Sequence, residues 1–240
     1  MLTQSAAGSD ISNRLMRQSP SRVTPNRLGG TIDFLGTLMS FPGNAEIYGE
    51  GEPVDYFYKV LSGTVRTCKV SIDGRRQIGG FYPPGDMLGV EDSAEHTFSA
   101  EAVTDCQVLL INRRRVMARA AREAPVAQEL LRLIGHELER VQDHVLLLIK
   151  SAEERVASFL LEMAGPAPEG NTINLPMTRQ DIGEYLGLTL ETVSRTLAHL
   201  QATAAIEVHA RQIMLRDCSA LRRLSSATNQ NNSEVFRAAN

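Results

Sequence analysis

The chain has 240 residues, of which 42% are hydrophobic and 22% are charged, and its formal net charge is −3. These fractions are typical of a soluble globular protein with one or two domains. No apolar run approaches the roughly 18 residues of a membrane span, and the N-terminus lacks the apolar core of a signal peptide, so we expect a cytoplasmic protein that makes no membrane contact. Three widely spaced cysteines, Cys68, Cys106 and Cys218, fit a reducing compartment rather than a disulfide scaffold.

The first part of the chain changes from a polar segment to a run of short strands. Residues 1–26 are rich in Ser, Asn, Arg and Pro without periodicity, which predicts a flexible arm. Residues 27–120 contain apolar alternation interrupted by glycine turns; Phe57 to Leu61 and Gln107 to Ile111 predict strands, and Asp73-Gly74 predicts a tight hairpin. Such a pattern favours a small antiparallel barrel or roll.

The next part has a helical period. Within residues 121–150, apolar positions step by 4, 4, 3, 4 and 3 and form a narrow stripe, which comprises Leu130, Ile134, Leu138, Val141, Val145 and Leu148. A long helix with such a stripe is typical of a dimer interface. We therefore predict a homodimer through this helix; the alternative is that the stripe packs against the barrel of its own chain.

Residues 151–224 predict a second domain built around two short helices. One helix opens at Ser151, and residues 177–197 contain a pair that pivots on Gly187, with Thr178 and Thr189 placed to cap its members. The apolar faces of this pair are Ile182, Tyr185 and Leu186 on the first helix and Leu190, Val193 and Leu197 on the second. Two apolar runs, 206–208 and 213–215, predict a two-stranded wing, and the tail 225–240 is expected to be disordered.

The outward residues of the second helix, Glu191, Thr192, Ser194 and Arg195, suit the reading of base edges. Arg195 can bind a guanine with two hydrogen bonds, Glu191 can accept from a cytosine amino group, and Ser194 can pair with either. This pattern favours a helix-turn-helix that binds DNA. The alternative is a protein–protein hairpin in which Glu191 and Arg195 form an ordinary surface ion pair.

Charge does not supply a general attraction for DNA. Residues 151–240 contain 8 Arg, no Lys and 10 Asp plus Glu, which gives −2. Phosphate contacts must therefore come from a local cluster. The candidates are Arg179, Arg195, Arg211 and Arg216, with Thr178 and Gln180 as neutral donors.

This organisation resembles the CRP/FNR family of bacterial transcription regulators from about Asp33 to Leu221. The motifs that carry the resemblance are Gly51-Glu52, Phe57 to Val60, Ser62-Gly63, Gly85-Asp86, Gly89, Ser151 to Arg155, Thr178 to Gly183, and Glu191-x-x-Ser194-Arg195. The resemblance implies an α+β fold with an N-terminal antiparallel β-roll (cupin-like, of the cyclic-nucleotide-binding-domain type), a long dimerisation helix and a C-terminal winged helix-turn-helix. The last motif is similar to that of the FNR branch, which implies TTGA…TCAA palindromes as targets.

The resemblance also implies residue roles and a partner. Glu191, Ser194 and Arg195 become base readers, and the phosphate contacts fall to Thr178, Arg179, Gln180, Thr189 and Thr192. By the same analogy the loop 91–97 contacts RNA polymerase.

We expect no cofactor. Cyclic-AMP-binding members carry Gly-Glu and Arg-Ser-Ala where this chain has Gly89-Val90 and Phe98-Ser99-Ala100, and neither valine nor phenylalanine replaces the missing charged group. Cys106 is similar to the roll cysteine of iron–sulfur members, but residues 1–67 contain no cysteine to complete a cluster. Because it lacks both sets of ligands, the chain resembles the FixK subgroup, whose members are mainly activators in nitrogen-fixation and microaerobic gene control.

Two other functions compete with this interpretation. A cupin-like enzyme needs a metal-binding cluster, and His96 is the only histidine in the roll, so we do not expect an enzyme. A dimeric signalling module whose roll binds an unidentified effector, or which responds to thiol oxidation, is the stronger rival. Cys218 is its best redox candidate, since Cys68 and Cys106 are expected to be buried in strands.

One departure from relatives concerns the wing. Family members often have glycine where this chain has Ala204 and Ala210. Either alanine is strained if the backbone there requires a positive φ angle.

Overall fold

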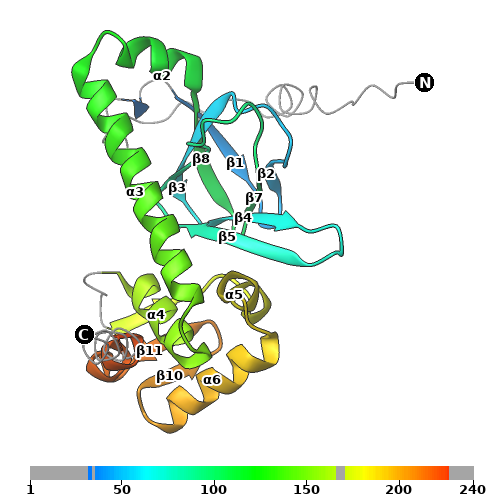
Figure 1. The fold of residues 1–240 in the computed structure, drawn as a ribbon, viewed down its shortest axis with the longest axis vertical. Helices are drawn as coiled ribbons and strands as arrows, with labels where there is room; N and C mark the ends of the chain where they lie inside the picture. Colours follow the sequence, from blue (N-terminus) through cyan, green and yellow to red (C-terminus); the bar gives the residue numbers. More distant parts are fainter. Residues whose placement is uncertain (1–31, 34–35, 166–170, 227–240) are drawn as a thin grey trace, which may run out of the picture. The chain divides into compact units, whose positions relative to one another are not determined.

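The computed structural model describes residues 32–33, 36–165 and 171–226 (Figure 1). The chain divides into two compact units, residues 1–140 and residues 141–240, and each is described by itself. The predicted arm 1–26 lies outside the described residues, as does the predicted tail except for Ser225 and Ser226, which are helical. Over the described ranges, no helix has both the length and the apolar character needed to cross a membrane.

The first unit contains an antiparallel β-roll followed by helices, as predicted. Two four-stranded sheets, ordered β1-β8-β3-β6 and β2-β7-β4-β5, enclose a core to which both contribute, including Tyr58 and Val108 from one and Val65 and Tyr82 from the other. The strands are β1 (Gly36–Phe41), β2 (Glu46–Tyr48), β3 (Tyr56–Ser62), β4 (Val65–Val70), β5 (Arg76–Tyr82), β6 (Met87–Leu88), β7 (Ser99–Ala102) and β8 (Cys106–Asn112).

Glycine turns set the register of the roll. The predicted hairpin at Asp73-Gly74 joins β4 to β5; Gly74 has φ +81°, and Ser71 N donates to Arg75 O at 2.8 Å. Gly63 ends β3 with φ +79°, and a Cβ there would lie 2.3 Å from Asp105 O. Both turns therefore need the conformational freedom of glycine.

The long helix predicted within residues 121–150 is present as α3, and a shorter helix that the sequence analysis did not predict precedes it. Helix α2 (Arg113–Ala120) ends in a turn, and helix α3 runs Ala124–Leu148. Pro125 lies in the first turn of α3, where its missing N–H has no intrahelical acceptor to satisfy. The preceding residues accordingly belong to the turn.

Leu130 was wrongly included in the partner-facing stripe. Its side chain is 8% exposed and belongs to the core cluster of its own roll with Phe57, Leu109 and Val126. Leu131 is 71% exposed instead. Counting from Leu131, the exposed stripe steps by 3, 4, 3, 4 and 3 to Leu148, which is a more regular heptad than the predicted one.

The second unit is a winged helix-turn-helix. Its elements are α4 (Ala152–Ala164), β9 (Thr172–Asn174), α5 (Arg179–Leu186), α6 (Leu190–Ala202), β10 (Ile206–His209) and β11 (Gln212–Leu215). The predicted wing strands pair, and β9, which the sequence analysis missed, adds a third strand beside β11. Leu190, predicted to lie in the core, is 40% exposed; it is the first residue of α6, and the first buried residue of that helix is Val193.

The conditional prediction about the two alanines is confirmed. Ala204 has φ +59° and Ala210 has φ +55°. Ala204 follows the end of α6, and Ala210 lies in the turn between β10 and β11. Both places favour glycine.

Candidate nucleic-acid interface

Helix α5 is fixed at both ends by its own sequence. Thr178 Oγ accepts from Asp181 N at 3.1 Å, and Thr178 N donates to Asp181 Oδ2 at 2.9 Å, which completes a capping box. The helix ends at Gly187, with φ +63°. A Cβ on Gly183 would lie 2.7 Å from Leu188 O, so this glycine permits the tight turn into α6.

The cap residue Asp181 was not predicted to matter. Its side chain is buried, at 1% exposure, although most aspartates stay in water. The signal was present in the spacing Thr178-x-x-Asp181, which matches the start of a capped helix.

Helix α6 presents the predicted base-reading residues outward. Thr189 Oγ accepts from Thr192 N at 3.2 Å and caps the helix, while Val193 and Leu197 are buried beneath it. Glu191 and Arg195 are therefore exposed, and Ser194 is half-exposed. The side chains that suit base edges lie together on one face of the helix.

The two charged residues on this face of α6, Glu191 and Arg195, do not pair with each other. Throughout the described part of the chain, no ion pair joins Glu191 to Arg195, so the surface pair offered as an alternative is not formed. The pKa of Glu191 is lowered by its own backbone N–H and by the Thr189 hydroxyl at the N-terminus of α6, which keeps the carboxylate ionised. An ionised Glu191 is the acceptor that a cytosine amino group requires.

The predicted phosphate contacts gather at the N-terminus of α5. Thr178, Arg179 and Gln180 are exposed there, and Arg179 Nη1 lies 3.5 Å from Ser194 Oγ on α6. Gln180 Nε2 already donates to Glu184 Oε1 at 2.9 Å. The structure thus joins the predicted phosphate contacts of α5 to the predicted base readers of α6 in one surface.

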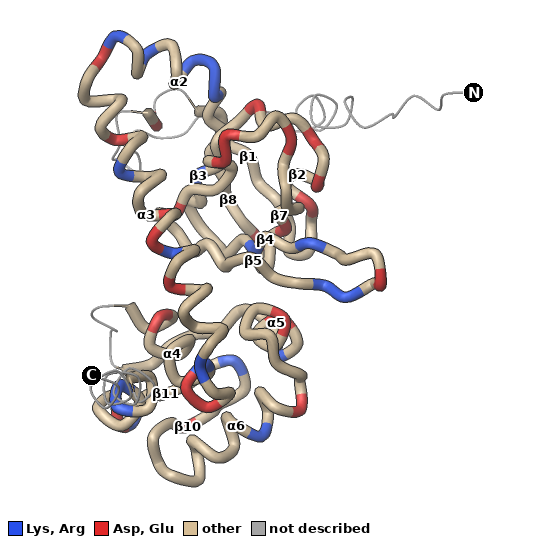
Figure 2. Tube along the Cα trace, in the orientation of Figure 1, with Lys and Arg blue, Asp and Glu red and all other residues tan. Residues whose placement is uncertain are grey.

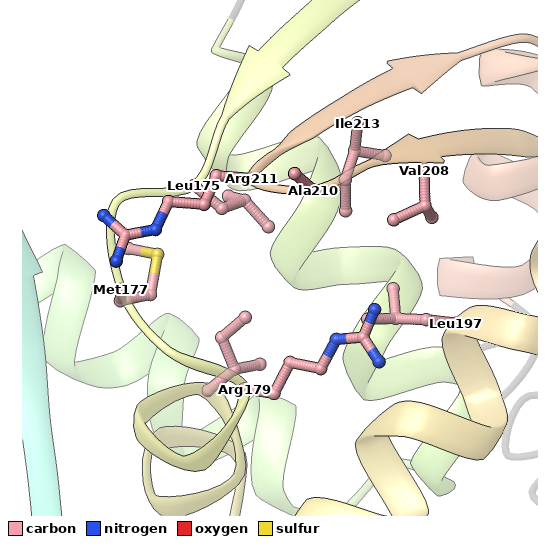
Figure 3. A pocket seen from close by; sticks show the side chains of 9 residues that line it. Leu175, Met177, Arg179, Leu197, Val208, Ala210, Arg211 and Ile213 are labelled. Atoms are coloured by element: carbon pink, nitrogen blue, oxygen red, sulfur yellow. The ribbon is translucent and has the colours of Figure 1, made fainter.

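A small cavity separates this surface from the wing. It has a volume of about 110 Å³, and its lining is mainly apolar, including Met177, Ile182 and Ile213. Figure 3 shows Arg179 on α5 and Arg211 on the wing on opposite sides of it. Two cations from different elements therefore border one recess.

Arg216, another candidate for phosphate, is engaged inside the wing. Its guanidinium donates through Nε to Glu207 Oε2 at 2.9 Å, and Glu207 Oε1 lies 2.7 Å from His209 Nε2. Arg211 is exposed at the wing turn. Among the described residues, Arg216 is thus paired with Glu207, whereas no ion pair involves Arg211.

Positive and negative residues are interspersed along the second unit (Figure 2). This agrees with the small negative charge counted for residues 151–240. Any preference for DNA must therefore come from the local cluster, as predicted.

Arg155 fastens the helix-turn-helix to the rest of its unit. Its guanidinium donates to three carbonyl oxygens: Leu186 at 2.8 Å, Leu148 at 2.6 Å and Lys150 at 2.8 Å. Leu186 and Leu148 are the last residues of α5 and α3, whose terminal carbonyls lack intrahelical partners. The motif Ser151 to Arg155 therefore has a structural role beside the DNA-reading surface.

The roll does not supply the groups that hold a cyclic nucleotide in relatives. Val90 is partly buried against the core cluster that contains Phe57, and the ring of Phe98 lies 3.0 Å from the place of a Cβ on Gly79. Neither side chain can bind a ribose hydroxyl or a cyclic phosphate through charge. The residues present do not fit that ligand in the mode of the family.

The two cysteines of the roll and its histidine, His96, are packed into its interior. Cys68 and Cys106 are buried, as predicted, while Cys218 is half-exposed. His96 is buried, stacks on Tyr48 at 3.7 Å between ring centroids, and has Nδ1 2.6 Å from Glu91 Oε1. Within the described ranges, no group of three His, Cys, Asp or Glu side chains is placed to hold a metal ion.

A β-roll, a long helix and a winged helix-turn-helix with an outward reading face define a DNA-binding transcription regulator. The family description "Crp-like helix-turn-helix domain" matches residues 154–224, and "Cyclic nucleotide-binding domain" matches residues 38–123. The chain belongs to the CRP/FNR family and is a FixK-like regulator within it.

Three relatives support this assignment. The nitrogen fixation regulation protein FixK of Azorhizobium caulinodans is 46% identical over 80% of each chain, and that of Rhizobium meliloti is 40% identical over 78% of this chain and 86% of its own. The structure of FixK2 from Bradyrhizobium japonicum matches 79% of this chain and 96% of its own, with 46% identity and a TM-score of 0.76.

These comparisons decide between the functions considered from the sequence. The relatives are transcription regulators and not enzymes, as predicted. A signalling module without DNA contact is not favoured, because the helix-turn-helix match covers α5, α6 and the wing. Regulators of this family are dimers.

Proposed function

We propose that the chain is an activator that binds TTGA-N6-TCAA-like palindromes as a homodimer, without cyclic nucleotide or iron–sulfur cofactor. The observation that carries the proposal is the outward face of α6, where Glu191, Ser194 and Arg195 lie together and no ion pair joins Glu191 to Arg195. The proposed domain limits are 27–120 for the roll, 121–150 for the dimerisation segment and 151–224 for the DNA-binding domain.

The biological role follows from the relatives. Two of them are nitrogen fixation regulation proteins. We propose that this chain controls genes of the same kind, for nitrogen fixation or microaerobic growth. Such work is done where the chromosome is, so the cytoplasmic location belongs to the same proposal.

The exposed stripe on α3 supports the homodimer. Ile134, Leu138, Val141 and Val145 are each at least 42% exposed, although large apolar side chains in rows are usually covered. A second copy of α3 offers a matching heptad stripe. Two-fold symmetry then presents two copies of α6 to the two halves of a palindrome.

The decisive experiment measures binding of the effector-free, reduced protein to a TTGA-N6-TCAA duplex and to a scrambled duplex at fixed salt, by fluorescence anisotropy. We expect selective binding to the palindrome. Arg195→Ala should lose at least about tenfold of that selectivity, because one bidentate guanine contact is worth roughly 1–3 kcal/mol in each half-site. Arg222→Ala, which removes an exposed arginine of the last helix, is the matched control.

Two results would contradict the proposal. Equal weak binding of the unaltered protein to both duplexes would show that an effector is missing or that the operator is different. Selectivity retained by Arg195→Ala would remove this residue from base reading.

The loop 91–97 is proposed to touch RNA polymerase. It is held in one shape, because Arg113 donates to Glu91 O and lies 3.0 Å from Asp92, and His96 N donates to Glu52 O at 2.8 Å. We expect Ser93→Ala together with Glu95→Ala to leave operator binding unchanged and to lower activated transcription in a reconstituted assay. Unchanged transcription would move the polymerase contact elsewhere.

A further inference from the structure

Helix α3 carries two parallel stripes with different environments. The roll-facing stripe consists of Val126, Leu130, Leu133, Glu137 and Arg140, spaced by 4, 3, 4 and 3 residues. Its apolar members pack in the core cluster of the roll. The exposed stripe, which starts at Leu131 and continues with Ile134 and Leu138, has the same period and lies one position away. The first stripe therefore determines the direction in which the second faces.

The last two members of the roll-facing stripe, Glu137 and Arg140, are charged and contact strand β5. The guanidinium of Arg140 lies over the ring of Tyr82 on β5, 4.3 Å from its centroid, and Nη2 donates to the Tyr82 hydroxyl at 2.5 Å. Glu137 accepts from Arg140 Nε at 2.9 Å and from the Tyr82 hydroxyl at 3.1 Å. These three side chains form a closed network of charge-assisted hydrogen bonds.

The network is well shielded from water. Tyr82 is 4% exposed, and the side chains of Arg140 and Glu137 are 14% and 22% exposed. An ion pair in this setting is screened far less than one on the surface. The network can therefore hold α3 against the roll without being broken by competing water.

Gly80 on β5 makes room for the guanidinium. A Cβ at this position would lie 1.9 Å from Arg140 Nη1 and 2.8 Å from Arg140 Cζ. Any side chain at position 80 would displace Arg140 from the strand. Gly80 and Arg140 are thus a matched pair, one from the roll and one from the helix.

At Val90 and Phe98 the roll lacks the charged groups that hold a cyclic nucleotide in the mode of the family, and it has this internal contact with α3. We propose that Arg140, held by Glu137, Tyr82 and Gly80, is a built-in substitute for an effector. The chain's own guanidinium keeps α3 on β5, so the exposed stripe is always presented to a second copy. Arg140 is a positioning residue for DNA binding, and this inference rests on the proposed effector-free operator binding.

The test compares three variants of the full-length protein. Arg140→Ala removes the guanidinium, and Gly80→Ala displaces it while leaving it in the chain. Arg119→Ala removes an exposed arginine of α2 that pairs with Glu123. We expect the first two to weaken effector-free operator binding by about tenfold, a usual size for coupling between sites. The double variant should be no worse than Arg140→Ala alone, and Arg119→Ala should bind as the unaltered protein does.

Two further readouts separate positioning from misfolding. Hydrogen exchange should rise in α3 of Arg140→Ala and Gly80→Ala, while the core strands of the roll keep their protection. Millimolar ethylguanidinium should restore operator binding to Arg140→Ala, because its head group fits the vacated place, and should not restore Gly80→Ala. If the roll of Arg140→Ala does not fold, operator binding and hydrogen exchange are compared in Gly80→Ala and Tyr82→Phe instead.

The inference is overturned by either of two results. One is that Arg140→Ala and Gly80→Ala bind the palindrome as tightly as the unaltered protein. The other is that their effects add in the double variant. Failure of the unaltered protein to select the palindrome is a different result, since it contradicts the proposed function itself.

Discussion

The charged side chains of the roll and those on the outward face of α6 have opposite surroundings. In the roll unit charges turn inward onto the chain: Lys59 Nζ lies 2.7 Å from the buried Asp33, and Arg66 lies 2.7 Å from Glu101. In the DNA-binding unit Glu191 and Arg195 point into solvent. A buried charge must be paired to be tolerated, whereas an exposed one can wait for a ligand. On the functions proposed above, the exposed charges of α6 bind DNA, whereas the paired charges of the roll stabilise its fold.

The comparison is tested most strongly on α3, where two adjacent leucines face different surroundings. Leu130→Ala should lower the free energy of unfolding of the roll unit by about 3 kcal/mol, because it empties a buried site. Leu131→Ala should change that free energy by less than about 0.5 kcal/mol and instead weaken the dimer. Urea unfolding followed by hydrogen exchange, with sedimentation for the dimer, measures both. Equal effects on stability would return Leu130 to the partner-facing stripe.

Leu130 and Leu131 also show what hydrophobic periodicity can and cannot predict. Both stripes of α3 have a heptad period and lie one residue apart, so spacing alone does not assign Leu130 to either. The assignment depends on Phe57 and Leu109, which are distant in sequence and become neighbours only when the roll closes. The roll, the helix-turn-helix and the wing were predictable, because their turns and caps are local signals.

A second test concerns the thiols of the two units. Burial raises the pKa of the Cys68 thiol to about 11, so its thiolate at pH 8 should be roughly a hundredfold scarcer than that of an ordinary cysteine. Cys218 is half-exposed. Labelling with a thiol reagent at pH 8 should show one fast site, which Cys218→Ser removes and Cys68→Ser leaves. A fast phase that survives in Cys218→Ser would indicate that the roll opens readily.

A third test concerns Arg155, an arginine of the DNA-binding unit whose guanidinium donates to carbonyl oxygens of its own unit. Arg155→Ala should cost about 2 kcal/mol in the stability of the DNA-binding unit, because three carbonyls lose a charged donor. Arg155→Lys should recover part of this, since an ammonium group lacks the planar fork that reaches all three. Thermal unfolding ranks the stabilities of the unaltered protein, Arg155→Lys and Arg155→Ala. Equal stability of Arg155→Ala and the unaltered protein would show that water replaces the guanidinium without loss.

Site residues were harder to predict than elements for a related reason. The outward face of α6 follows from its cap at Thr189 and its buried Val193, which are local. The pairing of Arg216 with Glu207 depends on the two wing strands lying in register, and the contact of Arg140 with Gly80 depends on α3 reaching β5. Sequence spacing does not contain such long-range pairings. The sequence alone therefore does not distinguish an arginine that pairs within the protein, such as Arg216, from one that is exposed and unpaired among the described residues, such as Arg195.

The smallest expected effect lies in the wing and the end of α6, where local preference and backbone geometry disagree. Ala204 and Ala210 have positive φ angles, a conformation that costs an L-residue with a Cβ roughly 1–2 kcal/mol. Glycine avoids that cost but loses more entropy on folding, so Ala204→Gly and Ala210→Gly should each stabilise the DNA-binding unit by about 0.5–1 kcal/mol.

Ala198→Gly is the matched control for these two, since Ala198 is exposed in the interior of α6 and the same exchange there should destabilise by about 1 kcal/mol. Opposite signs for one chemical change would locate the strain in the backbone rather than in lost contacts. The same sign at all three positions would mean that the wing relaxes its backbone in solution. In that case Arg211, which follows Ala210, would not be held in a fixed place beside the cavity for a phosphate to meet.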